Sequence, residues 1–123
     1  MKVLVDTSVW IDFFRGKPDE QALTDMLRED RVITHPWVIL ELELGHLGSR
    51  RRQIVIDLWQ ICGVGISDHH EIQTFINEEG LYGKGLSLVD VELLYTCLIR
   101  DCLLWTNDKA LKKQASKYGK IFQ

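Results

Sequence analysis

The chain has 123 residues, 46% of them hydrophobic, and a formal net charge of −3 at pH 7. This length supports the core of one ordinary domain and leaves no room for another, so we expect a single domain over residues 1–123. No apolar run approaches the roughly 20 residues needed to cross a bilayer, and the three cysteines are odd in number, which favours a cytoplasmic protein with reduced thiols and excludes a membrane-spanning one.

The first half of the chain alternates between strand-like and helix-like patterns. The expected elements are, in order, a strand at 2–5, helices at 9–15 and 19–28, a strand at 31–34, and helices at 37–48 and 52–62. The segment from Gly16 to Pro18 would end the first helix, and Pro36 suits the start of the third one.

The second half continues this alternation. The expected elements are a short strand at 63–67, a helix at 69–79, a flexible loop at 80–86, a helix at 87–99, a strand at 102–105, a helix at 108–117 and an edge strand at 121–122. Strands separated by helices of this length require right-handed crossovers. The fold class is therefore α/β, a three-layer α/β/α sandwich around a central, mainly parallel sheet.

Four acidic residues stand where the chain leaves a predicted strand or enters a predicted helix: Asp6, Glu41, Asp90 and Asp108. A parallel sheet could gather them at one edge, where open α/β sheets bind their ligands. Crowded carboxylates repel one another unless a cation binds them, and hard oxygen ligands suit Mg²⁺, with Mn²⁺ as the alternative ion. Histidine and cysteine show no paired spacing of the zinc kind, so the pattern indicates a metal-dependent enzyme acting on phosphates.

Three of these acids also have a purely local explanation. Asp6 suits a turn or a helix N-cap, Ser87-x-x-Asp90 resembles a capping box, and Asp108 suits the first turn of a helix. Glu41 is harder to explain locally, because it falls in an apolar helix start where an unpaired buried carboxylate costs several kcal/mol. We therefore expect Glu41 to be buried and to have a partner.

Four segments, in this order, resemble the successive motifs of PIN-domain ribonucleases, and the size of the chain resembles the VapC toxin branch of bacterial and archaeal toxin–antitoxin pairs. The segments are Val3–Ile11, Glu41-Leu42-x-x-Gly45, Leu88-Val89-Asp90 and Leu104–Leu111. The resemblance implies a PIN-like fold, divalent-metal-dependent RNA cleavage, a homodimer, and inhibition by a cognate VapB-like antitoxin that reaches into the acidic pocket.

The resemblance also implies residue roles. Four acids match the family's catalytic, metal-binding site and two hydroxyls support it: Asp6, Glu41, Asp90 and Asp108, with Ser8 and Thr106. We expect a metal-activated water to hydrolyse an RNA phosphodiester, with Asp6 and Asp90 as direct ligands. Glu41 and Asp108 would ligate a second ion or position the water, and the number of ions stays open.

Because the chain is acidic overall, only local basic groups can contact RNA. The candidates are Arg50, Arg51, Arg52, Lys109, Lys112 and Lys113. A solvated helix face explains each patch equally well. Two other functions stay open: a non-catalytic PIN-like RNA-binding module, and a haloacid-dehalogenase-like phosphatase that uses Asp6 as nucleophile. Residues 48–85 carry no motif of the family, which leaves substrate choice undecided.

Overall fold

A computed structural model describes residues 1–17 and 20–123. Three short strands form one parallel sheet in the order β2-β1-β3, where β1 is Val3–Val5, β2 is Val32–Ile33 and β3 is Leu103–Trp105. The expected α/β class with a parallel sheet is thus confirmed. The expected end of the first helix at Pro18 and the start of the next at Asp19 lie outside the described residues.

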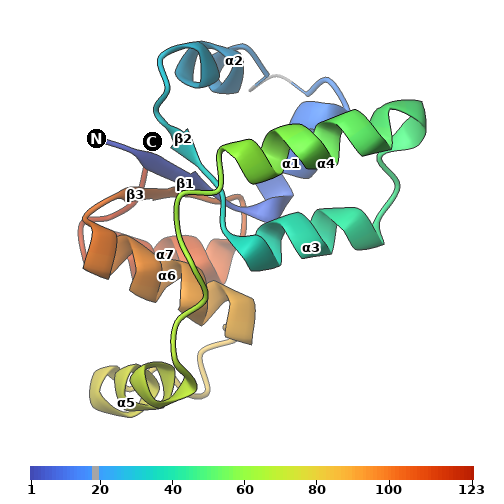
Figure 1. The fold of residues 1–123 in the computed structure, drawn as a ribbon. Coiled ribbons are helices and arrows are strands. Elements are labelled where there is room, and N and C mark those ends of the chain that lie inside the picture. Colours follow the sequence, from blue (N-terminus) through green and yellow to red (C-terminus); the bar gives the residue numbers. More distant parts are fainter. Residues whose placement is uncertain (18–19) are drawn as a thin grey trace.

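Seven helices and one 3₁₀ turn are seen in the described part of the chain. They are α1 (Thr7–Phe14), α2 (Glu20–Arg28), α3 (Pro36–Leu44), the turn η1 (Gly48–Arg50), α4 (Arg51–Gln60), α5 (His69–Glu79), α6 (Leu88–Arg100) and α7 (Lys109–Lys117). Figure 1 shows α6 and α7 together on one side of the sheet, and α1, α3 and α4 grouped on the other. None of the described helices is long and apolar enough to span a bilayer.

The sheet is smaller than the sequence predicted. The expected strand at 63–67 is wrong, because the one bridge near it joins Thr34 to Cys62, just before that segment. The expected strand at 121–122 is reduced to a single parallel bridge between Leu104 and Ile121. The first segment has no continuous buried face, since Ile66 is 53% exposed. The helix expected to reach residue 48 ends at Leu44, where Gly45 takes an extended backbone.

The core is centred on the sheet. The three residues of β1 are fully buried and are joined in one cluster by apolar side chains of α3 and α6. Each such side chain contributes about 2 kcal/mol by leaving water. All three cysteines are free thiols, and Cys97 and Cys102 are buried in this cluster. The burial holds the carboxyl ends of β1 and β3 side by side, where Asp6 N–H donates to the carbonyl of Trp105 at 2.9 Å.

A buried histidine and glutamate join α3 to α6, and the sequence reasoning missed them. His35 caps α3, where its Nδ1 accepts a hydrogen bond from Trp37 N–H at 3.0 Å. Its Nε2 lies 2.6 Å from Glu92 Oε2, which also accepts from Ser67 N–H at 2.9 Å. Burial lowers the pKa of His35 more than Glu92 raises it. A neutral ring that accepts at Nδ1 must donate from Nε2, so this pair sets the start of α3 against α6.

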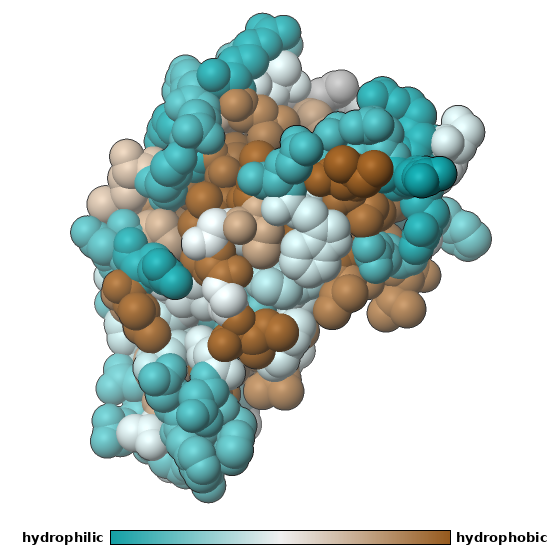
Figure 2. All heavy atoms as spheres, in the orientation of Figure 1, coloured by the Kyte–Doolittle hydropathy of each residue, from teal (hydrophilic) through white to brown (hydrophobic). Residues whose placement is uncertain are grey.

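Large hydrophobic side chains also remain on the surface. Leu44 is 89% exposed, and Leu88 and Ile66 are exposed by more than half. Figure 2 shows hydrophobic atoms at the surface over α3 and α4, whereas α5 presents hydrophilic side chains. Ile66 and Leu88 line one pocket together, whereas Leu44 lies at the end of α3, so apolar side chains are exposed in more than one place.

Candidate active site

Asp6 occupies the junction between β1 and α1 and is only 6% exposed. As the N-cap of α1 it accepts a hydrogen bond from Thr7 N–H at Oδ1, at 2.7 Å. At Oδ2 it accepts from the hydroxyl of Thr106 at 2.6 Å and from that of Ser8 at 3.1 Å. Three donors therefore hold one carboxylate in a single orientation.

The same two hydroxyls organise the connection from β3 to α7. The Ser8 hydroxyl accepts from Asn107 N–H at 3.1 Å, and the Thr106 hydroxyl accepts from Asp108 N–H at 3.0 Å. Asp108 in turn caps α7, where its Oδ1 accepts from Leu111 N–H at 2.8 Å. The structure thus places both predicted hydroxyls between Asp108 and the end of β1.

Asp90 lies in the first turn of α6, where it both caps the helix and interacts electrostatically with other acids. It forms a capping box with Ser87, whose N–H donates to Asp90 Oδ2 at 2.9 Å and whose hydroxyl accepts from Asp90 N–H at 3.1 Å. Burial raises the pKa of Asp90 above its usual 3.8, and the charges of Asp108 and, more weakly, Asp6 raise it further, against the lowering effect of Ser87. The three aspartates, which are far apart in sequence, therefore share one electrostatic site.

Glu41 joins this site through α1, but the expectation that it is buried is wrong. Its Oε1 accepts a hydrogen bond from the Thr7 hydroxyl at 2.6 Å, and its side chain is exposed. The inner face of α3 includes Leu42, whereas Glu41 and Leu44 lie on the outer side. An apolar neighbourhood in sequence did not imply burial, because α3 is apolar on both of its faces.

The donor set fits a hard divalent cation. Within the described residues, each of three acids keeps one carboxylate oxygen that no protein group hydrogen-bonds: Glu41 Oε2, Asp90 Oδ1 and Asp108 Oδ2. Oxygen ligands of this kind, completed by water and a phosphate oxygen, are what Mg²⁺ prefers. A cation would also relieve the repulsion that raises the pKa of Asp90.

A different group of side chains lies closer together than the acids do. Among the described residues, the one group of three potential ligands with donor atoms within 4.8 Å of one another is Asp68, His69 and His70, at the start of α5. The sequence reasoning found no such grouping of histidines. All three are exposed, and two of the three donors are imidazole nitrogens, whereas Mg²⁺ prefers oxygen ligands, so the oxygen-rich acidic site is the better place for Mg²⁺.

The predicted basic residues are not all directed to the acids. Arg50 lines a separate cavity of about 510 Å³, and the guanidinium of Arg51 donates to the carbonyl of Glu43 at 2.9 Å. Lys109, Lys112 and Lys113 are exposed on α7. Since α7 begins directly after Asp108, these lysines flank the acidic site, whereas Arg50 does not.

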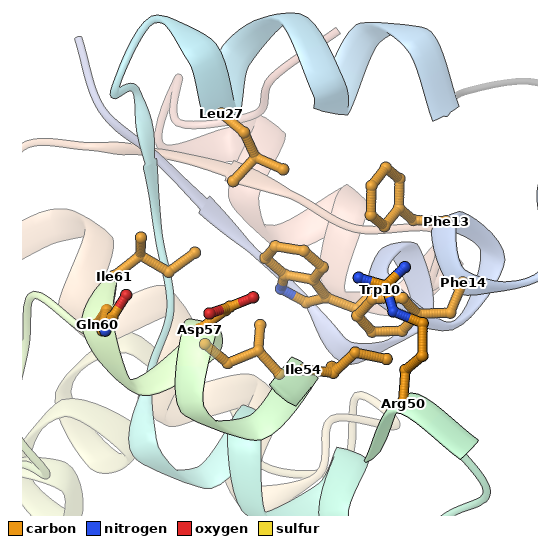
Figure 3. Close-up of a pocket in the computed structure, with 10 residues that line it drawn as sticks. Trp10, Phe13, Phe14, Leu27, Arg50, Ile54, Asp57, Gln60 and Ile61 are labelled. Atoms are coloured by element: carbon orange, nitrogen blue, oxygen red, sulfur yellow. The ribbon is translucent and has the colours of Figure 1, made fainter. Parts of the chain in front are cut away.

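The cavity that Arg50 lines lies between α1, α2 and α4. Figure 3 shows the rings of Trp10, Phe13 and Phe14 on one side of it, with Arg50 and Asp57 at other positions around it. The indole N–H of Trp10 is buried and has no hydrogen-bond partner among the described residues. None of the four acids lines this cavity, which separates it from the acidic site.

The chain is similar in sequence and in fold to known proteins. The family model described as "PIN domain" matches residues 3–117. Two curated relatives named Ribonuclease VapC32, from Mycobacterium tuberculosis strains CDC 1551 / Oshkosh and ATCC 25618 / H37Rv, are each 36% identical over 119 residues, covering 95% of this chain and 93% of theirs. The crystal structure of PAE2754 from Pyrobaculum aerophilum matches with a TM-score of 0.65 at 14% identity, over 93% of this chain and 84% of that one, and supports the fold alone.

Proposed function

This chain belongs to the PIN-domain family, and from that premise we propose that it is a metal-dependent endoribonuclease, the toxin of a VapBC-type pair acting in the cytoplasm. The observation that carries this proposal is the carboxylate of Asp6, held by three donors at the carboxyl end of β1 and sharing one electrostatic site with Asp90 and Asp108. Relatives named as ribonucleases over nearly the whole chain support the same reaction.

In the proposed mechanism, three acids serve as metal ligands and the fourth orients the attacking water. When bound, Mg²⁺ or Mn²⁺ supplies a water of lowered pKa and offsets the charge that develops on the phosphate. Asp6 would be the most firmly held ligand, and Asp90 Oδ1 and Asp108 Oδ2, which no protein group hydrogen-bonds among the described residues, would be the further ligand atoms. Glu41, which Thr7 orients from one side, offers Oε2 to orient the attacking water and to accept its proton. Ser8 and Thr106 act by fixing Asp6.

Two rival functions are less well supported by this geometry. A non-catalytic RNA-binding module has no need for four acids and two orienting hydroxyls. A phosphatase of the haloacid-dehalogenase kind usually carries a second aspartate two residues after its nucleophile, and here Ser8 at that position donates a hydrogen bond to Asp6.

The decisive experiment is cleavage of total RNA by the purified protein with and without magnesium. We expect cleavage only with metal, and Asp6→Asn should abolish it because the amide removes the ligand charge. Glu78→Gln on exposed α5 is the matched control and should cleave like wild type. Tight RNA binding without metal-dependent cleavage by wild type would favour the non-catalytic module, and full activity of Asp6→Asn would refute the assigned site.

The proposed partner is a VapB-like antitoxin. An arginine side chain offers a planar fork of donors that matches a carboxylate cluster, so we propose that the antitoxin silences the site by inserting one. Expression of the chain alone should then arrest growth, and expression with the cognate antitoxin should restore it. Harmless expression of folded wild-type protein would contradict the toxin assignment.

We propose a homodimer as the working unit. The support is the exposure of large apolar side chains in two places, Leu44 at the end of α3 and the pair Leu88 and Ile66, which line one pocket. Light scattering on purified protein should give twice the monomer mass. A mass of one chain at micromolar concentration would contradict this arrangement.

RNA binding is proposed to use the exposed lysines of α7. Replacing Lys109, Lys112 and Lys113 with glutamine should lower the slope of log affinity against log salt by about 2, because each phosphate contact on single-stranded RNA releases about 0.7 counterion. Arg28→Gln, exposed on α2, is the matched control for charge. An unchanged slope in the triple variant would mean that this part of α7 is only a solvated face.

A further inference from the structure

A cavity of about 470 Å³ opens between α1 and the end of α3. Glu41 lines it, and Glu41 also accepts the hydrogen bond from Thr7 at the edge of the acidic site. Glu41 is therefore shared by the cavity and the acidic site. Its volume falls in the lower half of the range of about 300–1,000 Å³ that is common for small-ligand sites.

The walls of this cavity differ in chemistry. Ile11 and Phe14 supply an apolar wall from α1, while Arg15 and His46 add a guanidinium and an imidazole, both exposed. Phe14 is held from behind, since its ring stacks on Trp10 with centroids 5.8 Å apart and an interplanar angle of 21°. A firmly packed aromatic ring beside a cation is the combination on which a nucleobase and its phosphate bind.

We propose that this cavity is the subsite for the nucleotide next to the scissile phosphate of a single-stranded RNA. The base packs against Phe14 and Ile11, and its phosphate pairs with Arg15 and His46. This inference rests on the proposed function and deepens it, because it assigns to the α1–α3 cavity a substrate contact that the acidic residues alone do not provide.

The charges favour RNA over a peptide as the occupant. An antitoxin segment that approaches the acids with an arginine would be repelled by Arg15, whereas a phosphate would be attracted. Glu41 lines the same cavity near the acidic site, and a metal ion bound at the acids would offset its repulsion of the negative backbone. A nucleotide in the cavity would thus place its own phosphate on the basic side and the scissile phosphate at the acids.

The experiment uses two variants at exposed positions, Arg15→Gln and His46→Gln, with Arg28→Gln as the control of equal charge to the first. The first readout is cleavage of a short fluorescent single-stranded RNA in magnesium. We expect Arg15→Gln to raise KM about tenfold with kcat unchanged, since it removes binding that is equal in substrate and transition state. An RNA that lacks the base next to the cleaved bond should raise KM for wild type in a similar way.

The second readout does not depend on activity. Binding of the same fluorescent RNA, which stays intact in EDTA because the proposed hydrolysis needs the metal, is followed by fluorescence anisotropy. It should weaken about tenfold in Arg15→Gln, less in His46→Gln, and not in Arg28→Gln. If wild type cleaves RNA while both KM and oligonucleotide binding are unchanged in the two variants, the subsite is refuted and the ribonuclease assignment stands. If wild type never cleaves, the proposed function fails, and the anisotropy result alone supports or refutes RNA binding in the α1–α3 cavity. Loss of antitoxin inhibition in Arg15→Gln with unchanged RNA binding would assign the cavity to the antitoxin instead and overturn the inference.

Discussion

The charge crowding at Asp90 leads to a prediction about stability as well as activity. In Asp90→Asn the amide oxygen still accepts from Ser87 N–H, so the capping box is retained while the charge is removed. Two like unit charges about 4 Å apart repel by about 1 kcal/mol in bulk water and about 4 kcal/mol at an effective dielectric constant of 20, which sets an upper limit on the repulsion that removing one charge relieves. Asp90 is half-buried, so solvent screening leaves about 1.5 kcal/mol of stabilisation from the removed repulsion. Loss of the favourable interaction between the Asp90 charge and the dipole of α6 reduces this gain by about 0.5 kcal/mol.

The metal-free variant should therefore be more stable than wild type by about 1 kcal/mol, which for a domain of this size raises Tm by about 3–6 °C. In EDTA this difference is measured by thermal unfolding followed by circular dichroism. In millimolar magnesium the order should reverse, because wild type binds the ion in its folded state and the variant binds it more weakly. Cleavage by the variant should fall by at least about 100-fold, beyond what loss of a supporting contact costs.

The direction of the pKa shift of Asp90 predicts how the stability difference between wild type and Asp90→Asn depends on pH. The pKa of Asp90 is raised in the folded protein, so the folded state holds this proton to higher pH than the unfolded chain does. The resulting stabilisation of wild type is complete below 3.8, the ordinary pKa of the group, and is lost as the pH rises through the folded pKa. Without metal, Asp90→Asn should thus be no more stable than wild type at low pH, and its higher stability should appear as the pH rises.

The matched control is Glu78→Gln, which removes the same charge from the exposed surface of α5 and should leave both Tm and cleavage unchanged. If Asp90→Asn melts below wild type in EDTA at neutral pH, the carboxylates do not repel one another as the structure indicates. Retention of wild-type cleavage would refute the role of Asp90 as a ligand.

Three further changes test the supports of the site. Thr106→Val removes the 2.6 Å hydrogen bond to buried Asp6 and should destabilise the protein by about 1–3 kcal/mol and weaken magnesium affinity about 10–100-fold, measured by denaturant unfolding and calorimetric titration. Glu92→Ala leaves buried His35 without its partner and should cost about 3 kcal/mol in urea unfolding, whereas a loss below 0.5 kcal/mol would show that the pair contributes little. Leu44→Glu places a charge on the most exposed large apolar side chain and should convert the dimer to monomer in light scattering while circular dichroism shows a folded protein, and an unchanged mass would exclude Leu44 from the interface.

Local patterns determined a large part of this molecule. The apolar runs predicted all three strands within about a residue, because buried strands of a parallel sheet need continuous apolar sequence. The capping residues Asp6, Ser87 and Asp108 begin helices near where they were expected, since N-cap hydrogen bonds involve only neighbours in the chain. The order of the acids along the chain likewise carried the family resemblance that the family model confirms.

Only the tertiary structure decided which groups meet. The hydrogen bond from Thr106 to Asp6 joins positions 100 residues apart, and the contact of His35 with Glu92 spans 57. Glu41 was expected to be buried and is exposed, and residues 63–67 form no strand pairing, because burial and strand pairing depend on which surface packs against the segment. Sequence periodicity describes the faces of one element, whereas the free energy of a carboxylate depends on charges and donors that other elements bring to it.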